Sequence, residues 1–158
     1  MIKAQIARPI RHAVLRPGQP ADRLVYPDDD APTTLHLGVR VSNALVSVAS
    51  FYREPVSELV REDLCGCPSL APGVRIRGMA TLEPHRNRGY GRALVEHALK
   101  LLAERGDQFD ALWCNARTTA SGYYTKLGFA IGSDEFDLPD IGPHLVMVRP
   151  VTRAQEVC

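Results

Sequence analysis

The clearest hydrophobic pattern in the chain has a helical period and runs from Tyr90 to Arg105. Its apolar positions are Tyr90, Leu94, Ala98, Leu101 and Leu102, and its polar positions are Arg92, Glu96, His97, Lys100 and Glu104. This stripe predicts an amphipathic helix packed on a core. Gly106 follows directly, and cations occupy the last turns, so we expect the helix to end there.

Other segments have the pattern of strands. The β-rich runs Leu35–Val41 and Ala44–Phe51 flank Ser42-Asn43, which predicts a hairpin. Residues 74–82 alternate, with Val74, Ile76 and Leu82 on one face and Arg75 and Arg77 on the other. Further strands are predicted at 111–114, 129–136 and 145–148.

The remaining segments are less regular. We expect a strand at 4–7, a short helix at 9–15 with Pro9 in its first turn, and partial helix at 54–64. Thr118 is predicted to cap a helix running through Tyr124, with Gly128 at its C-terminal stop. Residues 20–32 contain Asp28-Asp29-Asp30. We interpret them as a surface loop with a solvated acidic turn rather than a metal site, although such a loop could also help to select a cationic substrate.

A hairpin early in the chain and alternating strands and helices later predict an α/β fold, a mixed sheet with helices on both faces. The 158 residues are 45% hydrophobic, enough for one core, so we expect a single domain over 1–158.

Charge and apolar runs exclude several classes of function. With 19 basic and 18 acidic residues the net charge is +1, so no global field attracts nucleic acid or an anionic membrane. No apolar run reaches the roughly 18 residues that a membrane span needs, and the N-terminus lacks the apolar core of a signal peptide. These features predict a cytoplasmic protein that binds neither nucleic acid nor membrane.

The four cysteines are Cys65, Cys67, Cys114 and Cys158. They are too few and too scattered for a disulfide framework, so reduced thiols are expected. No second Cys or His pair follows Cys65-Gly66-Cys67 at ligand spacing, and no metal site is predicted.

The candidate chemistry begins just before the long helix, in the loop Pro84–Gly91. Gly89 and Gly91 let the backbone turn sharply, and Arg86 and Arg88 add positive charge in front of the helix N-terminus. This arrangement predicts an anion site for a phosphate or pyrophosphate. It is not a P-loop, because Arg92 follows Gly91 where lysine is required, and it lacks the third glycine of a dinucleotide fingerprint.

The spacing of Arg86, Gly89 and Gly91 is R-x-x-G-x-G, and the stretch 82–91 resembles the acyl-CoA loop of the GNAT superfamily of N-acetyltransferases. Downstream, 120–129 resembles the superfamily's segment in which a tyrosine precedes Gly-Phe. The resemblance implies the GNAT (acyl-CoA N-acyltransferase) fold, with a mixed, mostly antiparallel sheet, and acetyl-CoA as co-substrate.

The same resemblance implies roles for individual residues. The pantetheine arm would bond to the backbone of Met79, Ala80, Thr81 and Leu82, with a backbone amide near Leu82 polarising the thioester. The phosphates would bind at Arg86, Asn87, Arg88, Gly89, Tyr90, Gly91 and Arg92. Tyr124, five residues before Phe129, would protonate the coenzyme A sulfur, and Asn115 would bond pantetheine or a water, or serve as a cap.

The base is left open between Glu83 and His144. The implied function is direct acetyl transfer to a primary amine of an unidentified small molecule or peptide. The alternative is a non-catalytic acyl-CoA-binding or sensing module. Further segments, including 112–117 and 141–144, resemble a bacterial subgroup of GNAT acetyltransferases, which makes Arg16, His36, Arg117 and His144 candidates for the acceptor pocket. A homodimer is compatible with the family.

Overall fold

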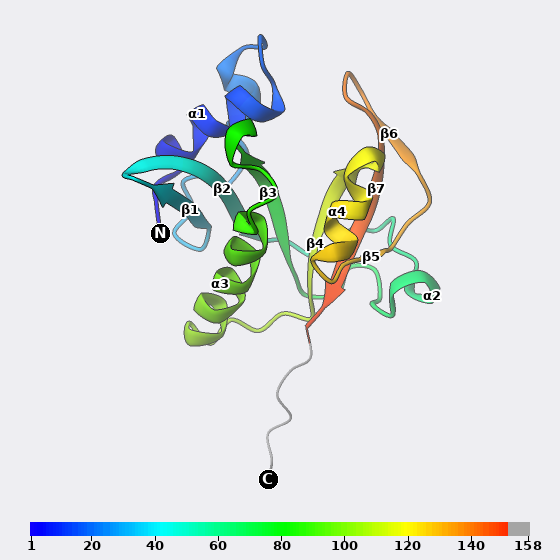
Figure 1. The fold of residues 1–158 in the computed structure, drawn as a ribbon. Helices are drawn as coiled ribbons and strands as arrows, with labels where there is room; N and C mark the ends of the chain where they lie inside the picture. The colour runs from blue at the N-terminus through cyan, green and yellow to red at the C-terminus, as the bar shows by residue number, and fades with distance from the viewer. Residues whose placement is uncertain (152–158) are drawn as a thin grey trace. The chain divides into compact units, whose positions relative to one another are not determined.

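The computed structural model describes residues 1–151 of the chain, which form two compact units. The first unit contains 1–52 and 76–107, and the second contains 53–75 and 108–151. Figure 1 labels the elements of both. No helix among the described residues is long and apolar enough to cross a bilayer.

The first unit is built on a β-hairpin. Strands β1 (Leu35–Val41) and β2 (Ala44–Arg53) pair antiparallel from Leu35 opposite Phe51 to Val41 opposite Ala44. Ser42 and Asn43 have φ values of 47° and 67°, as a tight hairpin turn requires. The predicted hairpin is therefore confirmed, and β2 continues two residues further than expected.

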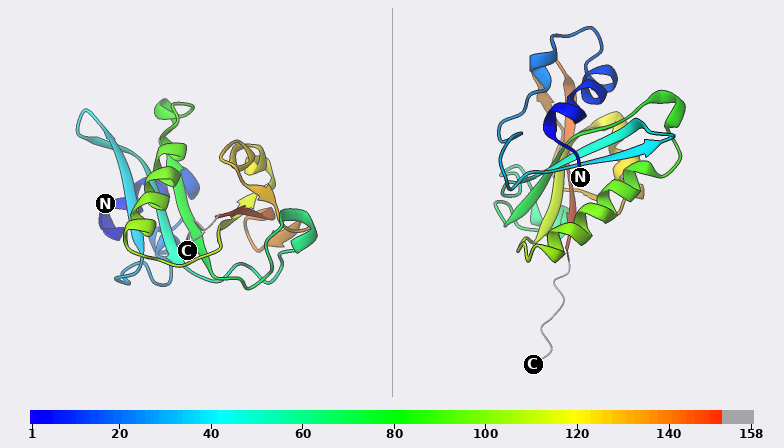
Figure 2. Two further views of the ribbon diagram at one scale, coloured as in Figure 1. Left: turned by 90° about the horizontal axis from the view of Figure 1, so that it is seen from below. Right: turned by 90° about the vertical axis from the view of Figure 1, so that its left-hand side faces the viewer.

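Two helices cover opposite sides of this hairpin, α1 (Ala4–Leu15) and α3 (Tyr90–Glu104) (Figure 2). Ala7 of α1 packs with Val48 and Ala80. The buried residues of α3 are Gly91, Leu94, Val95, Ala98 and Leu102. The predicted amphipathic helix is confirmed, except that Val95 is buried and Tyr90 and Leu101 are only half-buried.

The N-terminal prediction was wrong, because 4–7 is helix and not strand. Ala4, Ala7 and Arg11 are all buried, a spacing that places them on one face of a single helix. Pro9 lies inside this helix rather than in its first turn. The first unit also contains the 3₁₀ turns η1 (Ala21–Leu24) and η2 (Glu83–His85) and the end of β3 (Gly73–Thr81).

The second unit contains the start of β3 and the remaining strands of the described chain. These are β4 (Ala111–Arg117), β5 (Ala130–Ile131), β6 (Phe136–Leu138) and β7 (Gly142–Pro150). β3 pairs with β4 in parallel, whereas β4, β5 and β6 each pair with β7 antiparallel. The predicted mixed, mostly antiparallel sheet with flanking helices is confirmed.

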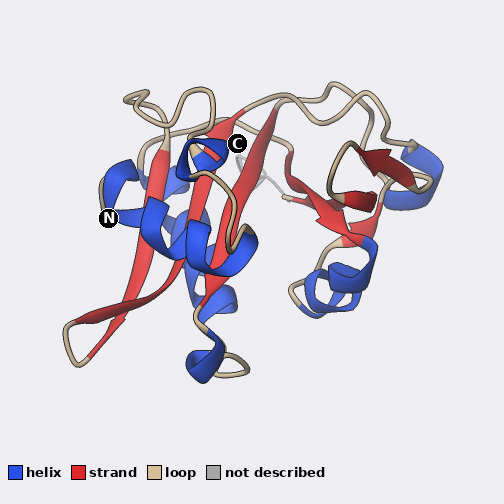
Figure 3. Cartoon of the chain, turned by 90° about the horizontal axis from the view of Figure 1, so that it is seen from above, coloured by secondary structure: helices blue, strands red, loops and turns tan. Residues whose placement is uncertain are grey.

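Helix α4 (Ser121–Lys126) lies against β4 and β7 (Figure 3). A core cluster that includes Val56, Cys67, Trp113 and Val146 packs together with the segment around α2 (Glu62–Cys65).

Two predictions for the second unit need correction, whereas the partial helix predicted at 54–64 is confirmed from Glu62 onward. Residues 129–136 do not form one strand but lead from the short strand β5 to the start of β6. Thr118 does not cap α4, because it starts the 3₁₀ turn η3 (Thr118–Ala120) and its carbonyl accepts a 2.8 Å bond from the Ser121 hydroxyl.

Candidate functional site

The anion loop of the first unit leads directly into the N-terminus of α3. Asn87 and Gly89 have φ values of 60° and 78°, and this left-handed pair turns the chain from η2 into the helix. Within the described chain no side chain caps α3, and its first turn carries no acidic residue. The first-turn amides and the positive end of the helix dipole are thus presented without a competing carboxylate.

The charged side chains of the loop lie at the surface. Arg86, Asn87, Arg88 and Arg92 are all exposed. The Nε of Arg86 donates to the carbonyl of Thr81 at 3.3 Å, which ties the loop back to the end of β3. Guanidinium groups beside helix amides are a suitable environment for a phosphate or pyrophosphate.

The end of β3 is attached to its neighbour β2. The Thr81 hydroxyl lies 2.7 Å from the Ser47 hydroxyl, and the Leu82 amide donates to the Val46 carbonyl at 2.9 Å. The amide of Leu82 is therefore committed to β2. Upstream, Gly78 has a φ of 62°, which interrupts the regular strand.

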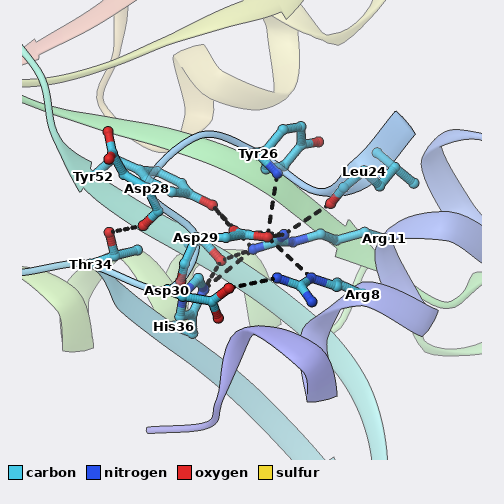
Figure 4. Close-up of polar contacts among 11 residues, drawn as sticks. Arg8, Arg11, Leu24, Tyr26, Asp28, Asp29, Asp30, Thr34, His36 and Tyr52 are labelled. Atoms are coloured by element: carbon cyan, nitrogen blue, oxygen red, sulfur yellow. Dashed lines mark hydrogen bonds and ion pairs between the residues drawn. The ribbon is translucent and has the colours of Figure 1, made fainter. Parts of the chain in front are cut away.

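A buried cluster ties α1, the acidic loop and the hairpin together (Figure 4). We call Arg11, Asp29, His36, Ser50 and Tyr52 the arginine cluster. Arg11 is 0% exposed, and its Nη1 donates to both Asp29 oxygens at 3.0 Å. Its Nη2 donates to the Ser50 hydroxyl at 2.6 Å and the Tyr52 hydroxyl at 3.2 Å, and Tyr52 in turn donates to Asp29.

The arginine cluster corrects the prediction of a solvated acidic turn. Asp28 and Asp30 are exposed, but Asp29 is 3% exposed. Burial alone would raise the pKa of Asp29, yet the Tyr52 hydrogen bond and the Arg11 charge outweigh it and the pKa is lowered. Asp29 is a charged structural anchor here.

His36, a candidate for the acceptor pocket, is also part of this cluster. Its Nε2 donates to the Asp29 carbonyl at 2.7 Å, which leaves Nδ1 as the acceptor for the Ser50 hydroxyl at 2.6 Å. Burial lowers the pKa of His36 and favours this neutral ring. Both ring nitrogens have protein partners, which favours a structural role.

In the second unit, Tyr124 lies on α4 among aromatic neighbours. Its ring meets Phe129 edge-on at 5.6 Å and Tyr123 at 5.3 Å between centroids. Its hydroxyl forms a hydrogen bond with Cys114 of β4, which is 2% exposed. Burial raises the pKa of the Cys114 thiol to about 12, against the opposing effects of Tyr124 and the Arg75 charge. Cys114 is thus a buried thiol that stays protonated.

Asn115, Arg117 and His144 lie on neighbouring strands of the second unit. Arg117 is directly opposite His144, and Asn115 is opposite Val146. The Oδ1 of Asn115 is buried and has no hydrogen-bond partner within residues 1–151. His144 is 5% exposed, and its Nδ1 must donate to the Gly142 carbonyl at 2.7 Å, so a neutral ring keeps the lone pair on Nε2.

The structure thus places the predicted site residues in two groups. Met79–Arg92, with the exposed Glu83, belong to the first unit, and Asn115, Tyr124 and His144 belong to the second. In the part of the chain that the structure describes, no three metal-ligating side chains gather, and Cys65, Cys67 and Cys114 are free thiols. Cys158 lies outside the described residues.

Sequence reasoning missed Arg11, Gly78 and the contact between Tyr124 and Cys114. A lone glycine within a strand pattern was a signal for an irregular β3. No comparable signal marked Arg11, because an arginine in an amphipathic helix ordinarily faces solvent. The Tyr124 contact joins different elements, so spacing along the chain does not indicate it.

Comparison with known proteins gives a family match and a similar relative. Residues 52–135 match the family described as FR47-like protein. YitI, an uncharacterized N-acetyltransferase of Bacillus subtilis (strain 168), is 43% identical over 140 residues, covering 89% of this chain and 87% of YitI.

Two solved structures show the same fold at low sequence identity. The ribosomal-protein-S18-alanine N-acetyltransferase of Escherichia coli is 18% identical with a TM-score of 0.66, over 98% of this chain and 92% of its own. An aminoglycoside 6'-N-acetyltransferase complexed with coenzyme A is 14% identical with a TM-score of 0.58. The match covers 84% of this chain and 81% of the aminoglycoside enzyme. The chain therefore belongs to the FR47-like family, within the GNAT superfamily of N-acetyltransferases.

Proposed function

We propose that the chain acts as one catalytic domain that binds acetyl-CoA and transfers its acetyl group directly to a primary amine. The pyrophosphate binds at the N-terminus of α3, held by the first-turn amides and by Arg86 and Arg88. In the first unit, the backbone of 79–82 binds the pantetheine arm. In the second unit, the buried Oδ1 of Asn115, without a partner within residues 1–151, is an acceptor for pantetheine or a water. The observation that carries the proposal is the R-x-x-G-x-G loop in front of a long helix without a side-chain cap.

In the transfer, the uncharged amine nitrogen attacks the thioester carbonyl carbon. The C–N bond forms and the C–S bond breaks, and the departing sulfur takes the phenolic proton of Tyr124. The amine loses its surplus proton to a base. This role requires the Tyr124 hydroxyl to be oriented, and the ring contacts with Tyr123 and Phe129 hold the ring in place.

Of the two candidate bases, His144 is the better supported. The bond from its Nδ1 to Gly142 fixes the tautomer whose Nε2 can accept a proton. Glu83 is exposed at the start of η2. We expect His144→Gln to lower kcat at least tenfold and Glu83→Gln to have a smaller effect. The opposite order, measured with the same amine, would assign the base to Glu83.

The proposal is tested by calorimetric titration with acetyl-CoA, followed by a thiol-release assay over a panel of amines. Arg86→Ala combined with Arg88→Ala should abolish binding. Tyr124→Phe should slow turnover on the order of a hundredfold while binding is kept. Tyr123→Phe is the matched control, because Tyr123 is the 44% exposed neighbour on the same helix, and it should retain activity.

Each outcome has a distinct meaning. Equal loss of binding in Tyr124→Phe would make Tyr124 structural. Binding without thiol release across a broad panel would favour the sensing alternative, and no binding at all would refute the anion site.

A further inference from the structure

We infer that Ser47 is a positioning residue for Arg86, which it orients through Thr81 and the peptide bond that follows Thr81. The inference rests on the proposed binding of the pyrophosphate by Arg86. Ser47 lies on β2, outside the anion loop, and is 0% exposed, so it can act on the coenzyme only through its neighbours. All of these residues belong to the first unit.

The first contact is a hydrogen bond between two hydroxyl groups. The Oγ of Ser47 lies 2.7 Å from the Oγ1 of Thr81. Among the described residues, the Ser47 side chain makes no other hydrogen bond. Because a buried hydroxyl needs a partner, Ser47 and Thr81 fix the rotamers of each other's side chains. The end of β3 is thereby held against β2.

The second contact fixes the peptide between Thr81 and Leu82. The Leu82 amide donates to the carbonyl of Val46, the residue before Ser47, at 2.9 Å. In a planar trans peptide the N–H and the C=O point in opposite directions. The Thr81 carbonyl therefore points away from β2. Two consecutive residues of β2 thus hold Thr81, one through its side chain and one through the amide that follows it.

The third contact joins this carbonyl to the anion loop. The Nε of Arg86 donates to the Thr81 carbonyl at 3.3 Å. An arginine has five N–H donors, so this bond leaves the four of Nη1 and Nη2 for another partner. Within residues 1–151 these two nitrogens form no hydrogen bond or ion pair, and Arg86 is exposed. The Thr81 oxygen has a second lone pair, which can still accept from a pantetheine amide.

This arrangement holds the guanidinium of Arg86 before the coenzyme arrives. An arginine that is free to rotate loses rotamer freedom when it binds a phosphate, and holding it beforehand improves affinity by roughly two- to tenfold. Removing the Ser47 hydroxyl should release Thr81 and, through it, Arg86. The effect belongs to coenzyme binding and not to the chemical step, because neither Ser47 nor Arg86 contacts the reacting atoms in the proposed mechanism.

The test compares Ser47→Ala and Thr81→Val, which each remove one hydroxyl, with Thr81→Ser, which keeps it. In calorimetric titration the first two should weaken acetyl-CoA binding about fivefold, and kcat at saturating coenzyme should be unchanged. Thr81→Ser should bind like the wild type. Thr34→Val is the matched control, since Thr34 is a half-buried threonine of the same unit whose hydroxyl donates to the Asp28 carbonyl at 2.7 Å. It should leave binding unchanged.

A double-mutant cycle separates this role from a general effect on the sheet. Arg86→Ala alone keeps Arg88 and should leave measurable binding. In that background Ser47→Ala should weaken binding less than about twofold, because the side chain that Ser47 positions is gone. An equal loss in both backgrounds would overturn the inference. If Ser47→Ala does not fold, the combination with Thr81→Val, which leaves neither hydroxyl without its partner, takes its place in the cycle.

A measurement without ligand distinguishes failure of the inference from failure of the proposed function. In protein labelled with ¹⁵N-arginine, the Nε–H resonance of Arg86 is identified by its absence in Arg86→Ala. Its hydrogen exchange should be at least about twofold faster in Ser47→Ala, because the bond to Thr81 is formed less of the time, and unchanged in Thr34→Val. Identical exchange in Ser47→Ala and the wild type would overturn the inference even if the wild type binds acetyl-CoA. No binding by the wild type would refute the anion site itself, whatever the exchange rates.

Discussion

The most unusual single residue in the chain is a fully buried arginine. Arg11 bonds to Asp29, Ser50, Tyr52 and the Leu24 carbonyl, and its guanidinium lies 4.9 Å from the centre of the Tyr26 ring. Breaking a buried ion pair leaves an uncompensated charge, which is costlier than losing a surface pair. The position of the 20–34 segment therefore depends on the carboxylate of Asp29, which holds Arg11.

We expect Asp29→Asn to lower the free energy of unfolding by about 3 kcal/mol or more, because Arg11 keeps its charge without a counterion. Asp30→Asn is the control, as Asp30 is 85% exposed in its pair with Arg8 and should change stability by less than about 1 kcal/mol. Urea denaturation of both variants measures the difference. Similar values for the two would contradict the anchoring role of Asp29.

The same residue predicts a dependence of stability on pH. The pKa of Asp29 is lowered from 3.8 in the folded protein, so its contribution is full above that value and is lost as pH falls below it. Stability of the wild type should decline in this acid range. Asp29→Asn should flatten that decline in urea midpoints measured from pH 6 to pH 3, and an identical slope would refute the assignment.

At the scale of elements, β3 is adapted to the arginine. A Cβ on Gly78 would lie 2.6 Å from Arg11 Nε, and Gly78 also has a positive φ. Only glycine meets both conditions without strain. The irregular backbone at Gly78 immediately precedes 79–82, the segment proposed to bind pantetheine, so the packing of α1 influences the backbone of the site.

Gly78→Ala should therefore destabilise the protein by about 2 kcal/mol or more, through the positive φ and the clash with Arg11. Gly122→Ala is a matched control, because Gly122 lies within α4 and an added Cβ meets nothing within 4 Å. That change should be neutral or stabilising by up to about 1 kcal/mol. Thermal unfolding of the two variants distinguishes them, and equal effects would show that neither space nor φ matters at Gly78.

Elements with strong local signals were predictable from sequence. The Ser42-Asn43 turn and the apolar stripe of α3 are set by local backbone and burial preferences, so both were found with small errors at their ends. The strand prediction at 4–7 was wrong because four residues are too few to distinguish the hydrophobic period of a helix from that of a strand. The burial of Asp29 depends on Arg11, 18 positions away, and three consecutive aspartates look alike in sequence.

At the scale of the whole molecule, each unit carries its own core and its own part of the candidate chemistry. The loop 84–91 and Tyr124 could both be predicted from sequence as candidate site residues, because their motifs are short and contiguous. The side chains that hold Tyr124 and shape β3 were not, because their contacts join distant segments. Anion binding can be tested on the intact chain through its stability.

Acetyl-CoA at a hundred times its Kd should stabilise the folded protein by about 2.7 kcal/mol, which corresponds to a rise in Tm of roughly 5 to 10 °C. The rise should disappear when Arg86 and Arg88 are both changed to Ala. Changing Arg23 and Arg40, two exposed arginines of the same unit, should leave it intact. Scanning calorimetry with and without ligand measures each case, and a shift kept by the first double variant would place the phosphates elsewhere.

The packing of Arg11 against Gly78 and Asp29 also constrains how this sequence can change over generations. A single substitution at any of the three positions leaves a buried charge without its partner or creates a steric clash. Variants with only one of these substitutions should therefore be unstable, which disfavours stepwise replacement of the cluster by apolar residues. We therefore expect residues 11, 29 and 78 to change together or not at all. In a saturation library, tolerated replacements at position 78 should appear mainly in clones that have already lost the arginine.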